Sequence, residues 1–373
     1  MDILSSRIKS VDVFRGFAVA LMVLANNPGN TERNYVQLRH APWSGLTFAD
    51  FGFPFFVIVM GLTIPIVMKK RLEANVGILS IILNIFKRSI MLILLGLILN
   101  GFPVYDFHSI RIPGVLQRLG IVYLFSALIY IVLKKSVKKD EYVLGSLIAI
   151  STIIILGYYF LLKPYGFAVE GNLVQRIDSY YLKGHLAYGT WDPEGIISTI
   201  PSIATGVFGC VMGCILTYKS KNEYFKVLGM GIFAFVTFLG AFLFSKIMFF
   251  SKMIWTSSFV LITVAVAAAS LTLLYLICDI FKKDNLFKPL VFLGSSPIFV
   301  YLVSEFIRKT LWLIPIHDTQ FKDPLLFCKW VTLKFITPWA GNWLDSLYFS
   351  ILYLILWVWI SSKIYAKEKF IKI

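Results

Sequence analysis

The sequence predicts an all-α polytopic membrane protein, a bundle of about ten transmembrane helices with both termini on the cytosolic side. Three observations predict this class. Hydrophobic residues make up 58% of the 373 residues, whereas an average soluble domain is about 45–50% apolar. The mean hydropathy is +0.78. Runs of Leu, Ile, Val and Phe recur along the whole chain, and many are as long as the roughly 20 residues that a helix needs to cross a bilayer.

The first two expected spans, 11–28 and 47–68, flank a short connection. The first ends at the sequence Asn-Asn-Pro-Gly, where Pro and Gly stop a helix. Asp12 and Arg15 interrupt its apolar run, and no convincing small-residue cleavage site follows. We therefore expect a retained span and not a cleaved signal peptide. The second span begins near Thr47 and ends at the basic sequence Lys69-Lys70-Arg71.

The later spans are separated by short charged connections. Span 78–100 contains Lys87 and Arg88, which leaves open whether its first turns lie at the interface and the true span begins near Ser89. The others are expected at 113–133, 142–162, 195–217, 227–249, 256–281, 289–313 and 341–362. The longest polar connections are about 30 residues, too short for a separate domain. Residues 1–373 are therefore expected to form a single integral-membrane domain.

The orientation follows from the distribution of Lys and Arg. Alternate short connections are almost purely basic, and short loops of that kind lie on the cytosolic side. They contain Arg7, Lys9, Lys69, Lys70, Arg71, Lys134, Lys135, Lys138, Lys139, Lys219, Lys221, Lys226, Lys282, Lys283, Lys288, Lys363, Lys367, Lys369 and Lys372. Both termini are then cytosolic, as an even number of spans requires.

The same distribution excludes some classes of function. The net charge is +16, but the charge does not form a basic stripe interleaved with aromatic residues, so nucleic acid is not an expected partner. All 4 histidines fall in outer connections without metal-type spacing, and we expect no metal site. The 4 cysteines imply no disulfide framework.

The most informative stretch is His40–Phe56, HAPWSGLTFADFGFPFF. It places an imidazole in the connection just before a span, and histidine takes and returns a proton most readily near neutral pH. Asp50 lies inside the apolar start of that span, where a carboxylate needs a partner, and His40 or an Arg is the natural one. This pair fits a catalytic base with its orienting acid, and it also fits structural polar packing. Trp43 fits an interfacial anchor or a sugar-stacking platform.

Two motifs in the first span have both a structural and a functional interpretation. Asp12 and Arg15 stand at i, i+3, which fits an ion pair that lowers the cost of insertion or an arginine that contacts a phosphorylated cosubstrate. Asn26 belongs to the helix-ending motif, and its amide could also polarise a reacting carbonyl or position an acceptor.

Polar residues also precede three later spans at their outer ends. Arg111, Gln117 and Arg118 surround the start of span 113–133 and are expected to face the bundle interior. Asp192 fits a helix cap before span 195–217, next to Glu194. Lys252 and Trp255 precede span 256–281 and fit interface anchors or ligand contacts.

Together these strings resemble the heparan-alpha-glucosaminide N-acetyltransferase family of transmembrane acyltransferases. The similarity follows the family's order in Asp12–Gly16, Asn26–Gly29, His40–Phe56, Arg111–Gly120, Asp192–Ser202, Lys252–Leu261 and, more weakly, Gly294–Glu305. HAPWSGLTFAD and RIPGVLQR are the specific strings. Where family members often carry Met-Asn-Ser, this chain has Ser295-Ser296-Pro297. It lacks the N-terminal lumenal domain of the animal enzyme, so we expect the compact bacterial branch.

The resemblance implies transfer of acetyl from cytosolic acetyl-CoA, a cosubstrate, to the amine of an amino sugar or glycan across the membrane. The family's active-site His falls on His40 and its accompanying Asn on Asn26. Asp50 is the expected orienting acid. The substrate contacts are expected among Asp12, Arg15, Trp43, Arg111, Gln117, Arg118, Asp192, Glu194, Lys252 and Trp255. A bacterial inner membrane is the expected location, and the oligomeric state, including a homodimer, is open.

Two other functions stay open. A sugar or solute transporter would have a similar number of spans, but it would favour internal repeats and mid-membrane contacts. This chain shows no repeat, and its polar strings gather at the outer ends of the spans. Acetylation of a hydroxyl on a cell-surface glycan would need a similar base. Consumption of the thioester by purified protein separates a transferase from a transporter.

Overall fold

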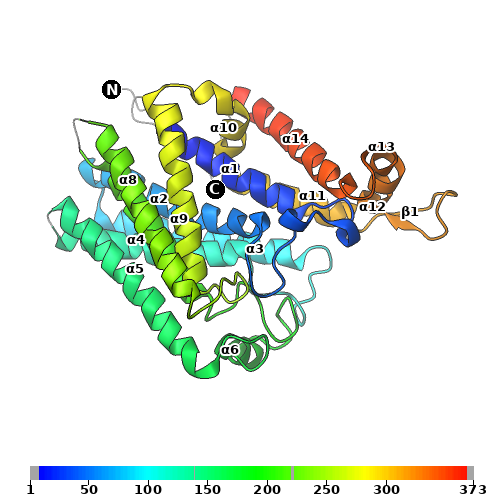
Figure 1. Ribbon diagram of the computed structural model, residues 1–373, viewed down its shortest axis with the longest axis horizontal. Helices are drawn as coiled ribbons and strands as arrows, with labels where there is room; N and C mark the ends of the chain where they lie inside the picture. Colours follow the sequence, from blue (N-terminus) through cyan, green and yellow to red (C-terminus); the bar gives the residue numbers. More distant parts are fainter. Residues whose placement is uncertain (1–7, 138, 220–221, 368–373) are drawn as a thin grey trace.

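The helical bundle expected from the sequence is confirmed in a computed structural model, which describes residues 8–137, 139–219 and 222–367 (Figure 1). In these ranges the only strands are a short antiparallel pair, β1 (Pro315–Ile316) and β2 (Leu325–Leu326). The helices are α1 (Lys9–Asn26), α2 (Gly52–Glu73), α3 (Ile78–Gly101), α4 (Val115–Ser136), α5 (Asp140–Leu162), α6 (Leu173–Tyr181), α7 (Thr199–Thr217), α8 (Tyr224–Ser245), α9 (Ser257–Leu274), α10 (Lys288–Ser295), α11 (Pro297–Leu311), α12 (Phe327–Val331), α13 (Thr337–Ala340) and α14 (Asp345–Ala366).

Each expected span contains a helix, but not each is one straight membrane-crossing helix. Among the described residues, 8 helices are long and apolar enough to cross a membrane, or 9 if the bent pair α10–α11 counts as one. The span expected at 289–313 consists of two helices that bend by 70°, because Pro297 begins α11 and cannot continue the preceding hydrogen bonds. The first expected span is α1, 18 residues long, which is not among these 8 helices and contains the charged residues Lys9, Asp12 and Arg15.

Helix α3 continues through its two basic residues, Lys87 and Arg88, without a break. It runs without interruption from Ile78 to Gly101 and is apolar enough for a span. The Arg88 guanidinium lies 4.8 Å from the centre of the Tyr123 ring on α4. This cation–π contact provides the charge with a partner inside the bundle. Where α3 enters the membrane, at its first turns or near Ser89, stays a prediction.

The centre of the bundle is the close packing of α2 against α7. A Cβ on Gly61 would lie 2.0 Å from the carbonyl oxygen of Gly206, and a Cβ on Gly209 would lie 2.4 Å from that of Ile58. Only glycine permits this backbone approach, which is the usual device for tight helix pairs in membranes. The glycine-rich part of span 195–217 therefore serves helix packing.

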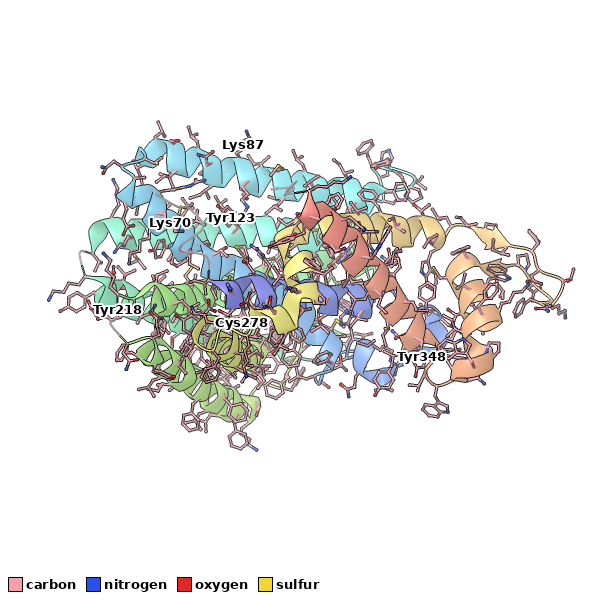
Figure 2. All side chains as sticks on the ribbon, turned by 90° about the horizontal axis from the view of Figure 1, so that it is seen from above. Lys70, Lys87, Tyr123, Tyr218, Cys278 and Tyr348 are labelled. Atoms are coloured by element: carbon pink, nitrogen blue, oxygen red, sulfur yellow. The ribbon has the colours of Figure 1, made fainter. Side chains whose placement is uncertain are left out.

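Loops gather at two opposite ends of the bundle. At one end, Lys9 bonds Asp284 at 2.8 Å and Lys69 lies 3.5 Å from Asp140, so the α1 start and the α2–α3, α4–α5 and α9–α10 connections meet. Figure 2 shows Lys70 and Tyr218 at this basic end and Tyr348 at the other. Of the basic set in the sequence, Arg7, Lys138, Lys221, Lys369 and Lys372 lie outside the described residues. Which end faces the cytosol stays a prediction.

Candidate active site

His40 is held against the carboxylate of Asp50 at the end of the bundle opposite the basic loops. The distance from His40 Nδ1 to Asp50 Oδ1 is 2.8 Å, and Asp50 is fully buried. The other carboxylate oxygen accepts hydrogen bonds from the backbone N–H of Thr47 at 3.0 Å and from its hydroxyl at 3.0 Å. A proton on Nδ1 that is donated to Asp50 leaves Nε2 as the unprotonated nitrogen. This is the arrangement of a general base with an orienting acid.

Lys252 completes the immediate surroundings of His40. Its Nζ lies 3.2 Å from both ring nitrogens, so it is not directed at either one alone. The loop that carries it is fixed by a hydrogen bond from Thr256 N to Ser251 O at 3.0 Å and by one from Gly45 N to Phe250 O at 2.8 Å. The contact therefore joins the loop before α9 to the loop before α2.

The electrostatic surroundings favour the neutral imidazole. Burial lowers the pKa of His40, the Lys252 cation lowers it further, and the hydrogen bond and charge of Asp50 oppose both without cancelling them. Burial likewise lowers the pKa of Lys252, against the charges of Glu194 and Asp50. The pKa of Glu194 is lowered although burial acts to raise it, because Arg111 and other cations outweigh the burial.

An arginine–carboxylate cluster adjoins this pair. Arg111 binds Asp192 with two hydrogen bonds, Nε to Oδ2 at 2.8 Å and Nη2 to Oδ1 at 2.6 Å, and it donates to Glu194 Oε2 at 2.5 Å. Arg118 is fully buried and donates to Ser198 Oγ at 2.5 Å. Its Nε and Nη1 atoms have no hydrogen-bond partner within the described residues. The sequence correctly suggested that Arg118 faces the bundle interior.

A second charged pair faces the site from α11. Asn26 Nδ2 donates to Glu305 Oε1 at 2.9 Å, and Arg308 Nη2 donates to Glu305 Oε2 at 2.7 Å. Glu305 and Arg308 were not predicted as site residues from the sequence. A signal was present, since an acid and an arginine at i, i+3 inside an apolar span are functional candidates.

These groups line one cavity of about 590 Å³. Its walls come from α1, α2, α4 and α11 and from the loops before α2, α7 and α9. The polar side chains on its surface are Asn26, Thr31, His40, Arg111, Tyr188, Glu194, Lys252, Tyr301, Glu305 and Arg308, and Trp312 lies at its edge. A cavity of this size matches small-molecule sites of roughly 300–1,000 Å³. Its three basic side chains, Arg111, Lys252 and Arg308, and its two carboxylates, Glu194 and Glu305, come from elements far apart in sequence.

The other expected site residues lie elsewhere. Asp12 and Arg15 form an ion pair at 2.7 Å on α1, and neither lines this cavity. Trp43 donates to Phe167 O at 2.9 Å and packs edge-on against Trp191. Gln117 lines a neighbouring cavity of about 160 Å³.

Asp192 and Trp255 do not line the cavity and contact the arginines of the site from within the bundle. Asp192 is fully buried and accepts hydrogen bonds from Arg111, so it aligns that guanidinium. Trp255 is also fully buried, donates to Thr205 at 3.2 Å, and lies 5.0 Å from the Arg118 guanidinium. The residues described contain no group of three or more His, Cys, Asp or Glu side chains arranged to hold a metal ion.

Comparison with known proteins follows the same segments. Residues 7–250 match a family described as "Domain of unknown function (DUF5009)". The chain is 29% identical to heparan-alpha-glucosaminide N-acetyltransferase of Homo sapiens, over 82% of this chain and 54% of that protein. It is 28% identical to the same enzyme of Mus musculus, over 81% of this chain and 54% of that protein. The chain thus spans about half the length of the curated relatives it matches, and the resemblance suggested by its sequence is confirmed.

Proposed function

The chain belongs to the DUF5009 family. From its similarity to an N-acetyltransferase we propose that it is a transmembrane acetyltransferase that moves acetyl from acetyl-CoA to the amine of an amino sugar or glycan. The observation that carries the proposal is the cavity in which His40, backed by Asp50, faces Asn26, Glu194 and Lys252. The similarity to two curated N-acetyltransferases supports the reaction type.

In this mechanism His40 is the base. An amine acceptor is mostly protonated at neutral pH and must lose a proton before it can attack. The ammonium first gives one proton to water, and the Nε2 atom of His40 takes the second proton as the amine nitrogen bonds to the thioester carbonyl carbon. The C–S bond then breaks, and the proton passes to the departing CoA sulfur. Asp50 keeps the ring oriented throughout, because its second oxygen is anchored at Thr47.

Two groups are placed to stabilise the oxyanion that forms on the carbonyl. The Lys252 ammonium supplies positive charge beside His40, and Asn26 has a second amide N–H besides the one donated to Glu305. Charge placed in advance where a transition state becomes negative is a large catalytic effect. The relatives that the chain matches are N-acetyltransferases, and this supports an amine over a hydroxyl as the acceptor.

The CoA phosphates fit the basic end of the bundle. A pocket of about 580 Å³ there is lined by Lys69, Lys70, Lys219 and Lys226 against a single acid, Glu73. Phosphate groups are drawn to such a concentration of cations. We place the cytosol on this side, as the basic loops predict. We propose that the membrane is the inner membrane of a bacterial cell.

Helix α2 sets the distance that the acetyl group must travel. Phe53 lines the His40 cavity and Lys69 lines the basic pocket, so the two sites stand about 24 Å apart at 1.5 Å per residue. The pantetheine arm must therefore enter the bundle and bring the thioester close to His40. The acetyl group then passes either directly to the acceptor or first to His40, which hands it on.

The test is release of CoA from acetyl-CoA by detergent-purified protein with glucosamine-type acceptors. His40→Ala should lower turnover about 10²–10⁴-fold, as expected for loss of a general base. His108→Ala is the matched control, because His108 is an exposed histidine at the same end of the bundle. Rapid quenching with labelled acetyl-CoA and no acceptor distinguishes the routes, since only the covalent route labels the protein. Wild-type turnover in His40→Ala would refute the mechanism.

A further inference from the structure

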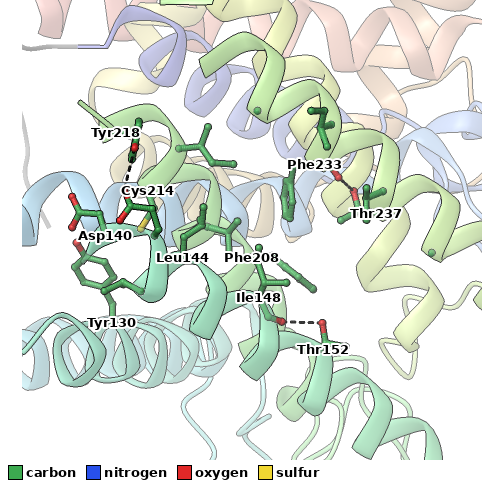
Figure 3. A pocket seen from close by; sticks show the side chains of 18 of the residues that line it. Tyr130, Asp140, Leu144, Ile148, Thr152, Phe208, Cys214, Tyr218, Phe233 and Thr237 are labelled. Atoms are coloured by element: carbon green, nitrogen blue, oxygen red, sulfur yellow. Dashed lines mark hydrogen bonds between the residues drawn. The ribbon is translucent and has the colours of Figure 1, made fainter. Parts of the chain in front are cut away.

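A second large cavity lies far from His40, on the flank of the bundle. It has a volume of about 670 Å³ and is bounded by α5, α7 and α8 (Figure 3). Its lining is mainly aliphatic and aromatic, with Leu144 and Ile148 from α5, Phe208 and Val211 from α7, and Phe233 and Val236 from α8. Only 28% of the membrane-spanning windows of α5 and α8 is buried in the bundle. The groove therefore lies where this protein meets lipid.

One end of the groove is polar, and it is the basic end of the bundle. Figure 3 shows Tyr130, Asp140 and Tyr218 together at that end and Phe233 and Thr237 farther along. Lys69 Nζ lies 3.5 Å from Asp140 Oδ2, and Tyr218 Oη donates to Glu141 Oε1 at 3.0 Å. Lys134 also bonds Asp140, so two lysines and two carboxylates meet at this end beside the phenols of Tyr130 and Tyr218. The groove itself is apolar for the rest of its length.

The groove is kept open by two glycines of α8. Gly229 and Gly240 both line it. A Cβ on Gly240 would come no closer than 3.5 Å to another residue, and one on Gly229 would lie 3.3 Å from Ile215. Larger side chains at these positions would therefore project into the groove without striking backbone. Gly231, on the same helix, does not line the groove, and a Cβ there meets nothing within 4 Å.

We propose that this groove binds one acyl chain of a membrane aminophospholipid, with the phosphate and the primary amine of its head group at the polar end. The lining runs on α5 from Asp140 to Leu156, about 24 Å at 1.5 Å per residue. One leaflet contributes roughly half of a ~30 Å hydrocarbon core, so the groove is long enough for one chain. An acyl chain in the groove would cover apolar surface of α5 and α8 that packing between these two helices leaves exposed.

The mixed charge at the polar end selects the head group. The phosphate is placed near Lys69, and the amine is placed near Asp140 and Glu141. Lys69 and Lys134 both pair with Asp140, whereas Glu141 is bonded by the Tyr218 phenol. A head group with only negative charge would bring its phosphate against Glu141 with no cation of its own. This end adjoins the lysine pocket described above and shares Lys69 with it, so we assign the CoA phosphates to Lys70, Lys219 and Lys226 and the lipid phosphate to Lys69.

The experiment is native mass spectrometry of the full chain, purified in mild detergent and incubated with equal amounts of phosphatidylethanolamine and phosphatidylglycerol. The wild type should retain one phosphatidylethanolamine in preference. Gly240→Leu and Gly229→Leu should each lower that retention about tenfold, which corresponds to about 1.4 kcal/mol. Gly231→Leu is the matched control, because it adds the same side chain to the same helix outside the groove, and it should retain lipid as the wild type does.

Head-group selection is tested separately by Glu141→Gln, which keeps the size of the side chain and removes a carboxylate. It should shift the preference toward phosphatidylglycerol while total occupancy stays high. This arm remains decisive if a leucine variant does not fold. Equal lipid retention in Gly240→Leu, Gly229→Leu and Gly231→Leu would overturn the proposal. So would recovery of CoA or of a second protomer in the groove, or an unchanged head-group preference in Glu141→Gln.

Discussion

Replacement of Lys252 by methionine should raise the pKa of His40 and move the acid limb of the pH–rate profile to higher pH. The direction follows from the contact of the Lys252 ammonium with both ring nitrogens at 3.2 Å. A neighbouring cation opposes protonation of the imidazole, and this is one of the causes that hold the pKa of His40 below its usual value. Because only neutral His40 accepts the proton, loss of the cation shrinks the pH range in which the base is competent.

The size of the shift follows from Coulomb's law at that distance. Two unit charges 3.2 Å apart interact by about 1.3 kcal/mol at the dielectric constant of water and by about 5 kcal/mol at an effective value of 20. The His40 side chain is 35% exposed but Lys252 is buried, so the value for water is a lower limit. One pKa unit corresponds to about 1.4 kcal/mol. We therefore expect the acid limb to move up by at least about one pH unit.

The assay is kcat/KM of acetyl-CoA turnover measured across pH, with the rate of His40 carbethoxylation by mass spectrometry as a readout that needs no catalysis. Lys252→Arg is the matched control, because it keeps the charge and should keep the wild-type limb. Asp50 and Glu194 are the other charged groups that act on His40, and both variants leave them in place. A Lys252→Met profile that overlays the wild type, or that moves to lower pH, would show that Lys252 carries no charge at this site.

Three further predictions concern the residues that support the site and the orientation of the protein in the membrane. Asp50→Asn should lower kcat about 10–100-fold, as for other residues that orient a functional side chain, and leave the KM for acetyl-CoA nearly unchanged in the same assay. Arg111→Met leaves two buried carboxylates without their cation and should destabilise the protein by about 3–5 kcal/mol in a thermal unfolding assay, whereas Arg176→Met on an exposed surface should not. Cysteines at Lys135 and Glu170 should label from opposite sides of the membrane in intact cells, and labelling of both from one side would refute the topology.

The sequence was sufficient for the fold class because transmembrane helices are encoded locally. Length and apolarity alone located α2, α3, α4 and α5. The bend between α10 and α11 was not predictable in the same way, because Pro297 is equally suited to the first turn of a new helix and to a kink in a continuous one. The outcome depends on which packing leaves room for α1, where Gly16 approaches the Leu290 carbonyl of α10.

The sequence identified many residues of the site, but it identified few of the contacts between them. The His40–Asp50 contact joins residues ten positions apart and was correctly anticipated. The contact of Lys252 with His40 spans 212 positions, and that of Asn26 with Glu305 spans 279. Such pairs are decided by how helices pack and not by local spacing. This is why Lys252 fitted an interface anchor equally well and why Glu305 was missed.

The charges around His40 explain how a buried cluster can support proton removal from an amine. Arg111, Arg118 and Lys252 are balanced by three carboxylates, those of Asp50, Asp192 and Glu194. With neutral imidazole the cluster therefore carries no net charge, and an isolated extra charge is costly to bury. Protonated His40 and a bound ammonium would each leave one excess positive charge. We infer that the cluster disfavours both, so the acceptor is bound most stably as the neutral amine, and the proton that it loses during attack leaves through His40 to the departing thiolate.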